Sequence, residues 1–245
     1  SIDAAEDDAV VGKVTADPYI GTRLGTAREQ HCASMSNTAE GQAGEALKWI
    51  EETTKTKLKC GFMLTGDLPG SVLQSLVLLC KAQRVLEIGA YTGYSAVAMA
   101  ATGAKVTTID SFEDEPESEA VFHEGVQRSG LDIKLERGKA LEVLTKLEAA
   151  VDAPFDLVFI DADKTEQIAY YDFLMDHPRL WSPTGAICVD NTLWYSRVLR
   201  DRVEDGDKQT QAVVDFNRYV RNDPRCFVSQ LPLRDGLTLI QRRRP

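Results

Sequence analysis

The chain has 245 residues, of which 43% are hydrophobic, and a formal net charge of -10 at pH 7. That length allows one large α/β domain or two smaller ones, and the apolar content suffices for one substantial core. The negative charge argues against nucleic acid or an anionic membrane surface as the main partner, although a local basic patch stays compatible with it.

The cysteines and the N-terminus bear on the compartment. Five cysteines are odd in number and widely spaced, without a CxxC pair, which favours reduced thiols over a disulfide framework. The N-terminus lacks the basic-then-apolar pattern of a secretory signal, and no apolar run approaches membrane-spanning length. We therefore expect a cytoplasmic protein with no membrane partner. The three histidines lack ligand spacing, which favours structural roles over zinc binding.

Strands and helices are predicted to alternate through most of the chain. The first 40 residues are polar and interrupted by prolines and glycines; helices are then expected over 45–52 and 71–81. The predicted strands are 84–88, 105–110, 132–136, 156–161 and 185–190. The helices after them are 95–102, 117–129, 141–149, 166–180 and 209–222. Two last strands, 226–231 and 237–242, flank a turn at Arg234-Asp235-Gly236.

This alternation predicts an α/β fold with a doubly wound, mostly parallel sheet. The terminal pair of strands must form an antiparallel hairpin at one edge, because the turn between them is too short for a crossover. One domain with an N-terminal helical cap fits the pattern best.

A glycine-rich turn, LEIGAYTGYS, follows the first strand of the alternation. It lacks the G-x-G-x-x-G spacing of a dinucleotide site, and Glu87 would repel a pyrophosphate. Asp110 ends the next strand, about 20 residues after Gly89, where an acid typically accepts hydrogen bonds from ribose hydroxyls. S-adenosylmethionine, with its positive charges, a ribose and no phosphate, meets these requirements. The plainer interpretation is a tight strand–helix turn capped by Ser95, but Glu87 and Asp110 together favour the cofactor.

Two later apolar runs end in oxygen-bearing side chains, in FIDADK and CVDN. Asp161, Asp190 and Asn191 are hard oxygen ligands that suit Mg²⁺ and tolerate Mn²⁺ or Ca²⁺, and Lys164 is a candidate base beside them. Each has an alternative role. Asp161 and Asp163 could cap a helix, Asp190-Asn191 could form an Asx turn, and Lys164 could be a solvated surface lysine. Their combination favours a metal site. The acidic stretch at 113–117 is interpreted as a loop that opens a helix, outside any site.

Four motifs, LEIGAYTGYS, FIDADK, DNTLW and RDGLTLI, occur in this order. With them the chain resembles the cation-dependent class I O-methyltransferases, the family of the caffeoyl-CoA and catechol O-methyltransferases. The resemblance covers roughly residues 63–242 and is closest to the caffeoyl-CoA branch. It implies a seven-stranded sheet of order 3-2-1-4-5-7-6 and, commonly, a homodimer. It also implies a methyltransferase domain over 63–245, preceded by a cap over 1–62 that helps to form the acceptor pocket.

The resemblance also implies the residues of a cofactor site. Ala140 would lie beside the adenine and Asp110 would bind the ribose. The methionine moiety and the adjoining turn would involve Glu87, Gly89, Ala90, Tyr91 and Ser95.

The remaining roles concern the metal and the acceptor. By the same resemblance, the metal ligands would be Asp161, Asp190 and Asn191. Asp161 would also lie near the cofactor amine, and Lys164 would be the general base. Asp163, Trp194 and Tyr195 are candidates for the acceptor site. For Asp163, capping is an equal alternative, and for the two aromatic residues the alternative is packing.

The chain departs from the family pattern in four places. Residues 63–66 read MLTG where the family has a Met-Gln-Val-Ser-like segment, and the region at 176–179 is longer than usual. Tyr195 replaces a small polar residue of plant members. Residues 1–60 match poorly. The acceptor is therefore the part of the resemblance that transfers least.

We expect an S-adenosylmethionine-dependent, divalent-metal-dependent O-methyltransferase of a vicinal-dihydroxy aromatic small molecule. A metal-bound phenolate would attack the sulfonium methyl group. The alternatives are a methyltransferase of a hydroxylated RNA base, a nicotinamide-dependent oxidoreductase, and a silent module that only binds the cofactor. The net charge counts against RNA, and Glu87 counts against a nicotinamide dinucleotide.

Overall fold

In the computed structural model, which describes residues 27–243, the predicted strands form one seven-stranded sheet. The strand order is β3-β2-β1-β4-β5-β7-β6. The strands are β1 (Arg84–Ile88), β2 (Lys105–Asp110), β3 (Ile133–Arg137), β4 (Phe155–Ile160), β5 (Trp181–Asp190), β6 (Cys226–Leu231) and β7 (Leu237–Arg242). β7 pairs antiparallel with both β5 and β6, and the other neighbours are parallel. The predicted fold class and strand order are confirmed.

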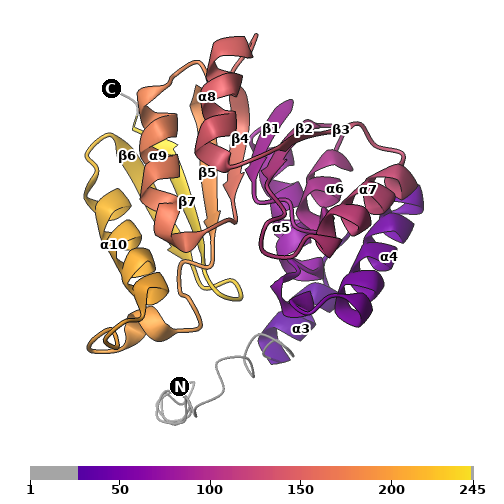
Figure 1. The fold of residues 1–245 in the computed structure, drawn as a ribbon, viewed down its shortest axis with the longest axis horizontal. Helices are drawn as coiled ribbons and strands as arrows, with labels where there is room; N and C mark the ends of the chain where they lie inside the picture. Colours follow the sequence, from indigo (N-terminus) through magenta and orange to yellow (C-terminus); the bar gives the residue numbers. More distant parts are fainter. Residues whose placement is uncertain (1–26, 244–245) are drawn as a thin grey trace.

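Helices cover both faces of this sheet (Figure 1). The α-helices are α3 (Ala27–Ser34), α4 (Gly41–Lys57), α5 (Asp67–Leu79), α6 (Tyr94–Ala100), α7 (Glu117–Ser129), α8 (Ala140–Ala150), α9 (Gln167–Asp176) and α10 (Lys208–Asn222). Short 3₁₀ turns are η1 (Gly61–Met63), η2 (Lys164–Glu166) and η3 (Arg197–Leu199). One face packs against α8, α9 and α10, and the other against α5 and α6, with α4 and α7 beside α6.

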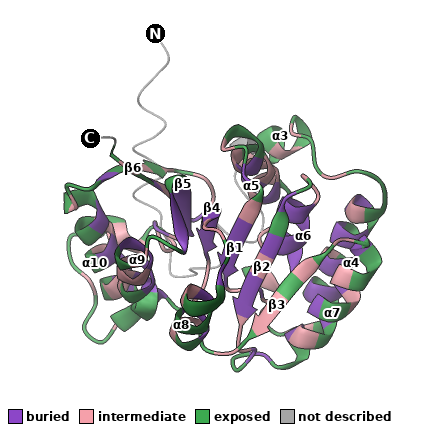
Figure 2. Ribbon diagram, turned by 90° about the horizontal axis from the view of Figure 1, so that it is seen from above, coloured by how far each residue is buried: buried purple, intermediate pink, exposed green. Residues whose placement is uncertain are grey.

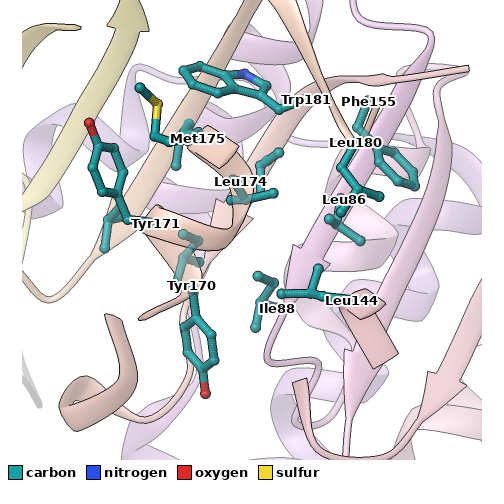
Figure 3. Packing of buried hydrophobic residues seen from close by; sticks show 14 of the residues in the cluster. Leu86, Ile88, Leu144, Phe155, Tyr170, Tyr171, Leu174, Met175, Leu180 and Trp181 are labelled. Carbon is teal, nitrogen blue, oxygen red and sulfur yellow. The ribbon is translucent and has the colours of Figure 1, made fainter. Parts of the chain in front are cut away.

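The central strands are apolar along their length because both of their faces are covered. Four of the five residues of β1 and five of the six residues of β4 are buried (Figure 2), as expected for parallel strands between two helical layers. The larger core lies under α8 and α9, where Leu144 of α8 and Tyr171 of α9 pack against the sheet, to which β5 contributes Trp181 (Figure 3). The apolar ends of β1, β2, β4 and β5 therefore fix where the side chains that follow them emerge.

Two boundaries differ from the prediction between β4 and β5. The predicted helix 166–180 ends at Asp176, and the strand predicted from Gly185 already begins at Trp181. Pro178 explains the first difference, since the residue before a proline is driven out of the helical region, and His177 has φ -118° and ψ 78°. Pro183 lies in the part of β5 that the prediction left outside the strand. The pairing with β4 shifts register between Phe155 and Leu157, an irregularity where a proline is tolerated.

The segment Gly61–Leu79 corrects the expectation that no apolar run reaches membrane-spanning length. Judged by length and composition alone, its 19 residues are long enough and apolar enough to cross a membrane. In the fold this segment consists of η1, extended residues and α5. The helix α5 starts four residues earlier than predicted, since Pro69 is tolerated in its first turn. Leu73 and Val77 of α5 are buried beneath the sheet.

The N-terminal helices pack against the rest of the fold in the part that the structure describes. Ile50 of α4 is fully buried, and a Cβ on Gly125 of α7 would lie 2.6 Å from its Cγ1, so a side chain at Gly125 would collide with Ile50. The proposed division at residue 62 stays a prediction, and residues 1–26 lie outside the described part.

Candidate active site

A cavity of about 620 Å³ opens at the carboxyl ends of β1, β2, β4 and β5. This is the edge where open α/β sheets bind their ligands. With one exception, it brings together all of the predicted site residues. Its lining includes Gly89, Ala90, Tyr91, Ser95, Asp110, Ala140, Asp161, Asp163, Lys164, Asp190, Asn191, Trp194 and Tyr195.

Glycine is required where the turn after β1 meets the end of β4. Gly89 has φ +101°, and a Cβ there would lie 2.0 Å from the carbonyl oxygen of Asp161. Gly93 has φ +84°, and a Cβ there would lie 2.8 Å from Phe122. A side chain at Gly89 would therefore force the turn away from the end of β4, and one at Gly93 would force it away from Phe122 of α7.

Asp110 is bound to the backbone of this turn. Its Oδ2 accepts hydrogen bonds from the amides of Ala90 (2.9 Å) and Tyr91 (2.8 Å), and its Oδ1 accepts one from Phe112 (2.7 Å). A carboxylate has about four lone-pair positions, so capacity for a ligand hydroxyl remains. The carboxylate therefore shapes the glycine turn directly, and ribose binding stays a prediction.

Glu87 is the exception, since it lies outside the cavity lining and is fully buried. Its Oε2 accepts a hydrogen bond from the Thr108 hydroxyl at 2.6 Å, whereas Oε1 has no partner among residues 27–243. Burial raises the pKa of Glu87 to about 8, against the opposing effect of the nearby Ser95 and Thr108 hydroxyls. Its predicted contact with the methionine moiety stays a prediction.

Without cofactor, Glu87→Gln is expected to have a higher free energy of unfolding than the wild type. This difference should grow as the pH rises from about 4.5 to 8. Below about pH 4.3 the carboxyl is neutral in both the folded and the unfolded state. Above that value only the unfolded chain ionises until the folded pKa of about 8 is reached. The wild type therefore loses up to about 1.4 kcal/mol of unfolding free energy per pH unit in this window.

Urea denaturation between pH 4.5 and 8.5 measures this difference. Glu142→Gln on the exposed surface of α8 is the matched control. If the free-energy difference between Glu87→Gln and the wild type does not change with pH, the carboxyl is ionised in the fold and the expectation is wrong.

The three predicted metal ligands lie together where β4 and β5 end. Asp161 follows β4, Asp190 ends β5, and Asn191 comes next with φ +60°. Burial and then the negative charge of Asp161 raise the pKa of Asp190, while the nearby ammonium of Lys164 opposes the shift. Two carboxylates that repel each other, beside an amide, form a donor set of hard oxygens that suits a divalent cation. The described residues contain no group of three His, Cys, Asp or Glu side chains placed to hold a metal ion, and the predicted set has only two such residues beside its asparagine.

Lys164 is held in the same place. Its side chain is only 7% exposed, and its Nζ lies 2.9 Å from Asp161 Oδ1. Asp163 caps the turn that follows it, since its Oδ1 accepts hydrogen bonds from the amide and the hydroxyl of Thr165, both at 2.9 Å. It also lines the cavity, and its role toward the acceptor stays a prediction. Lys164 is thus a buried, ion-paired lysine and not a solvated one.

Trp194 and Tyr195 form an aromatic wall of the same cavity. Their ring centroids lie 5.0 Å apart at an interplanar angle of 57°. Both line the cavity, and Arg197 lies 5.8 Å above the Tyr195 ring. A planar acceptor could stack on this wall.

The sequence from residue 35 to 243 matches the family model described as O-methyltransferase. The chain belongs to the O-methyltransferase family. A caffeoyl-CoA O-methyltransferase from Populus kitakamiensis is 32% identical over 212 residues, covering 81% of this chain and 86% of the relative. Tricin synthase 1 from Oryza sativa subsp. japonica is also 32% identical, covering 76% and 77%. An SAH-bound methyltransferase from Podospora anserina superposes with a TM-score of 0.73 at 25% identity, covering 100% of this chain and 98% of that one.

Membership confirms the predicted enzyme class, S-adenosylmethionine-dependent O-methyl transfer, and excludes the oxidoreductase alternative. It also extends the resemblance: the match starts 28 residues before Met63 and includes α4. The metal, the acceptor, the individual site residues, the homodimer and the cytoplasmic location stay predictions.

Several cavity residues of this O-methyltransferase were not among the predicted site residues. Glu115 lies in the acidic stretch that was expected to be outside any site. It is 8% exposed and accepts hydrogen bonds from the Tyr91 hydroxyl (2.7 Å) and the Lys59 amide (2.7 Å). The segment 62–65 and the turn at 233–235 also line the cavity. Burial raises the pKa of Asp235 in that turn, against the hydrogen bond from the Tyr195 amide.

Proposed function

We propose that this O-methyltransferase methylates one hydroxyl of a vicinal-dihydroxy aromatic small molecule and needs a divalent cation. One observation carries the proposal. Asp161, Asp190, Asn191 and Lys164 meet on the wall of the cavity that also contains the glycine turn. A methyl donor seated on that turn would therefore face an acceptor placed at the oxygen ligands.

The oxygen ligands would hold a cation such as Mg²⁺. When bound, the cation would supply Lewis-acid polarisation of the acceptor oxygens. Three protein oxygens leave about half of an octahedral shell for water and acceptor. Adjacent hydroxyls on one ring match two such positions, which supports a catechol-type acceptor over a simple phenol.

The chain's own residues would orient the acceptor and take up its proton. Lys164 Nζ, at 2.9 Å from Asp161 Oδ1, is placed to receive the hydroxyl proton once it is in its neutral form. The wall of Trp194 and Tyr195 would hold the ring in plane. Loss of water from the cavity favours transfer from a sulfonium to a phenolate, because the opposite charges cancel in the transition state.

The relatives support a phenolic acceptor, since their names refer to caffeoyl-CoA and tricin. The cavity lining does not favour a hydroxylated RNA base as the acceptor. Nine acidic residues line the cavity, and only three cations, Lys139, Lys164 and Arg234, lie among them.

Methyl transfer from S-adenosylmethionine to a panel of catechols, including caffeic acid and its coenzyme A ester, tests the proposal. Each acceptor is assayed with Mg²⁺ and with EDTA, next to a matched monophenol. Product that requires both the cation and the adjacent hydroxyls is expected. Product that persists in EDTA would overturn the metal requirement, and equal methylation of monophenols would overturn the diol. No product with any acceptor, despite cofactor binding by calorimetry, would point to another acceptor class, RNA included.

A further inference from the structure

The segment that carries the aromatic wall has an unfavourable backbone. Trp194, Tyr195 and Ser196 are three consecutive residues with φ between +46° and +58°, and Asn191 has φ +60°. The left-handed region costs a residue with a side chain roughly 1–2 kcal/mol. Such a conformation persists only where its surroundings determine it. Something outside the segment must therefore hold it.

The turn between β6 and β7 supplies that support. The amide of Thr192 donates to the Gly236 carbonyl at 3.1 Å, and the amide of Leu193 donates to the Asp235 carbonyl at 2.8 Å. A Cβ on Gly236 would lie 2.6 Å from the Leu193 nitrogen, so only glycine allows this approach. These bonds continue the β5–β7 pairing beyond Asp190, which is opposite Leu237.

The backbone pairing stops at Leu193, and a side chain takes over. The Asp235 carboxylate accepts a hydrogen bond from the Tyr195 amide, in the middle of the three left-handed residues. Asp235 is 8% exposed and lines the cavity. Its carboxylate therefore fixes the wall from the side of the acceptor site.

The turn itself is anchored from outside. Arg234 Nη1 donates to the Thr65 carbonyl at 2.7 Å, and the Arg234 amide donates to Glu29 Oε1 of α3 at 2.9 Å. The hairpin end of β6 and β7 is thus attached to α3 and to the segment before α5 (Figure 1). A turn held on both sides is a rigid support for the wall.

We propose that Asp235 is a positioning residue of the acceptor site, which holds Trp194 and Tyr195 in place through the Tyr195 amide. The role in turnover rests on the proposed function, because the wall is where the aromatic acceptor would stack. In this role the Asp235 oxygen that accepts the Tyr195 hydrogen bond holds the two aromatic residues, and the negative charge of Asp235 is not needed for it. Asp235 also lies within electrostatic reach of Lys164, so the test must separate these two roles.

The test compares Asp235→Ala with Asp235→Asn, whose amide oxygen still accepts the Tyr195 N–H while the charge is lost. Asp156→Ala is the matched control. Asp156 Oδ2 also accepts two backbone amides, those of Gln83 (2.8 Å) and Arg84 (3.1 Å), but at the opposite end of the sheet. For Asp235→Ala we expect a rise in acceptor KM of roughly tenfold or more and a fall in kcat. The affinity for S-adenosylmethionine should change less than about twofold.

Asp235→Asn is expected to recover most of the acceptor KM and kcat, and Asp156→Ala to leave both unchanged. If Asp235→Asn is as impaired as Asp235→Ala, the charge acts on Lys164 and the positioning role is wrong. Wild-type KM and kcat in Asp235→Ala would also contradict it.

A spectroscopic readout keeps the test independent of turnover. In protein labelled with 5-fluorotryptophan, the ¹⁹F resonance of Trp194 is assigned by its loss in Trp194→Phe. It should shift or broaden in Asp235→Ala and stay in place in Asp235→Asn and Asp156→Ala, while the resonances of Trp49 and Trp181 are unaffected. An unmoved Trp194 resonance in Asp235→Ala would overturn the proposal even if no catechol is methylated. A moved resonance without any turnover would support Asp235 and count against the proposed acceptor.

Discussion

Asp190→Ala is expected to abolish cation-stimulated methyl transfer, with a loss of at least ~10²-fold in turnover. Asp190 ends β5 at the point where Asp161 emerges from the neighbouring β4, so its removal leaves one carboxylate and one amide. Two oxygen ligands hold and orient a hard cation poorly, and a displaced cation no longer orients the acceptor.

The same variant is expected to keep its fold and its cofactor site. Asp190 makes no hydrogen bond to the glycine turn in the described structure; its Oδ1 accepts one from the amide of Asn191 at 2.9 Å. Removing it also relieves the repulsion with Asp161. S-adenosylmethionine affinity by calorimetry should therefore stay near the wild-type value.

Thermal unfolding with increasing Mg²⁺ separates the metal site from catalysis. A cation that binds only the folded state raises the melting temperature of the wild type in a concentration-dependent way. Asp190→Ala should lose this rise, and Asp132→Ala, at an exposed aspartate before β3, should keep it. If Asp190→Ala keeps both the Mg²⁺-dependent rise in melting temperature and full turnover, Asp190 is not a metal ligand.

The sheet could be predicted from the sequence because its strands are local apolar runs. β1, β2, β6 and β7 have the predicted bounds, and β4 differs by one residue at each end. Side chains that directly follow such strands were also accessible to prediction, since parallel strands deliver their carboxyl ends to one edge. Asp161, Asp190 and Asn191 are of this kind.

The supporting residues could not be predicted because their partners are distant in the chain. Glu115 looked like a member of a solvated acidic loop, and only the tertiary fold brings the Lys59 amide 2.7 Å from it. Asp235 looked like a turn residue between two strands, while its carboxylate acts 40 positions away on the Tyr195 amide. Local patterns contain no information about such contacts.

Lys164→Ala and Lys164→Arg together are expected to identify the base. If Lys164 accepts the hydroxyl proton, both variants should lose roughly 10²–10⁴-fold in kcat with a smaller change in acceptor KM. Arginine is the informative replacement because its guanidinium keeps the positive charge beside Asp161 but does not accept a proton in the accessible pH range.

The charge of Lys164 has a separate effect from its basicity. Its ammonium lies 2.9 Å from Asp161, a predicted metal ligand, and competes with a cation for that carboxylate. Lys164→Ala should therefore bind Mg²⁺ at least as tightly as the wild type, while Lys164→Arg should stay close to it. Calorimetric Mg²⁺ titrations and pH–rate profiles of the three proteins measure the two effects independently.

The two variants distinguish a base from a structural ion pair. A lysine that only pairs with Asp161 would be replaced well by arginine, which forms the same ion pair, so Lys164→Arg would keep the wild-type kcat and pH–rate profile. A base would be lost in both variants, and the limb of the profile that reports its deprotonation would disappear. Lys164 Nζ can accept the hydroxyl proton only in its neutral form, so the base role requires more of this residue than the ion pair with Asp161 does.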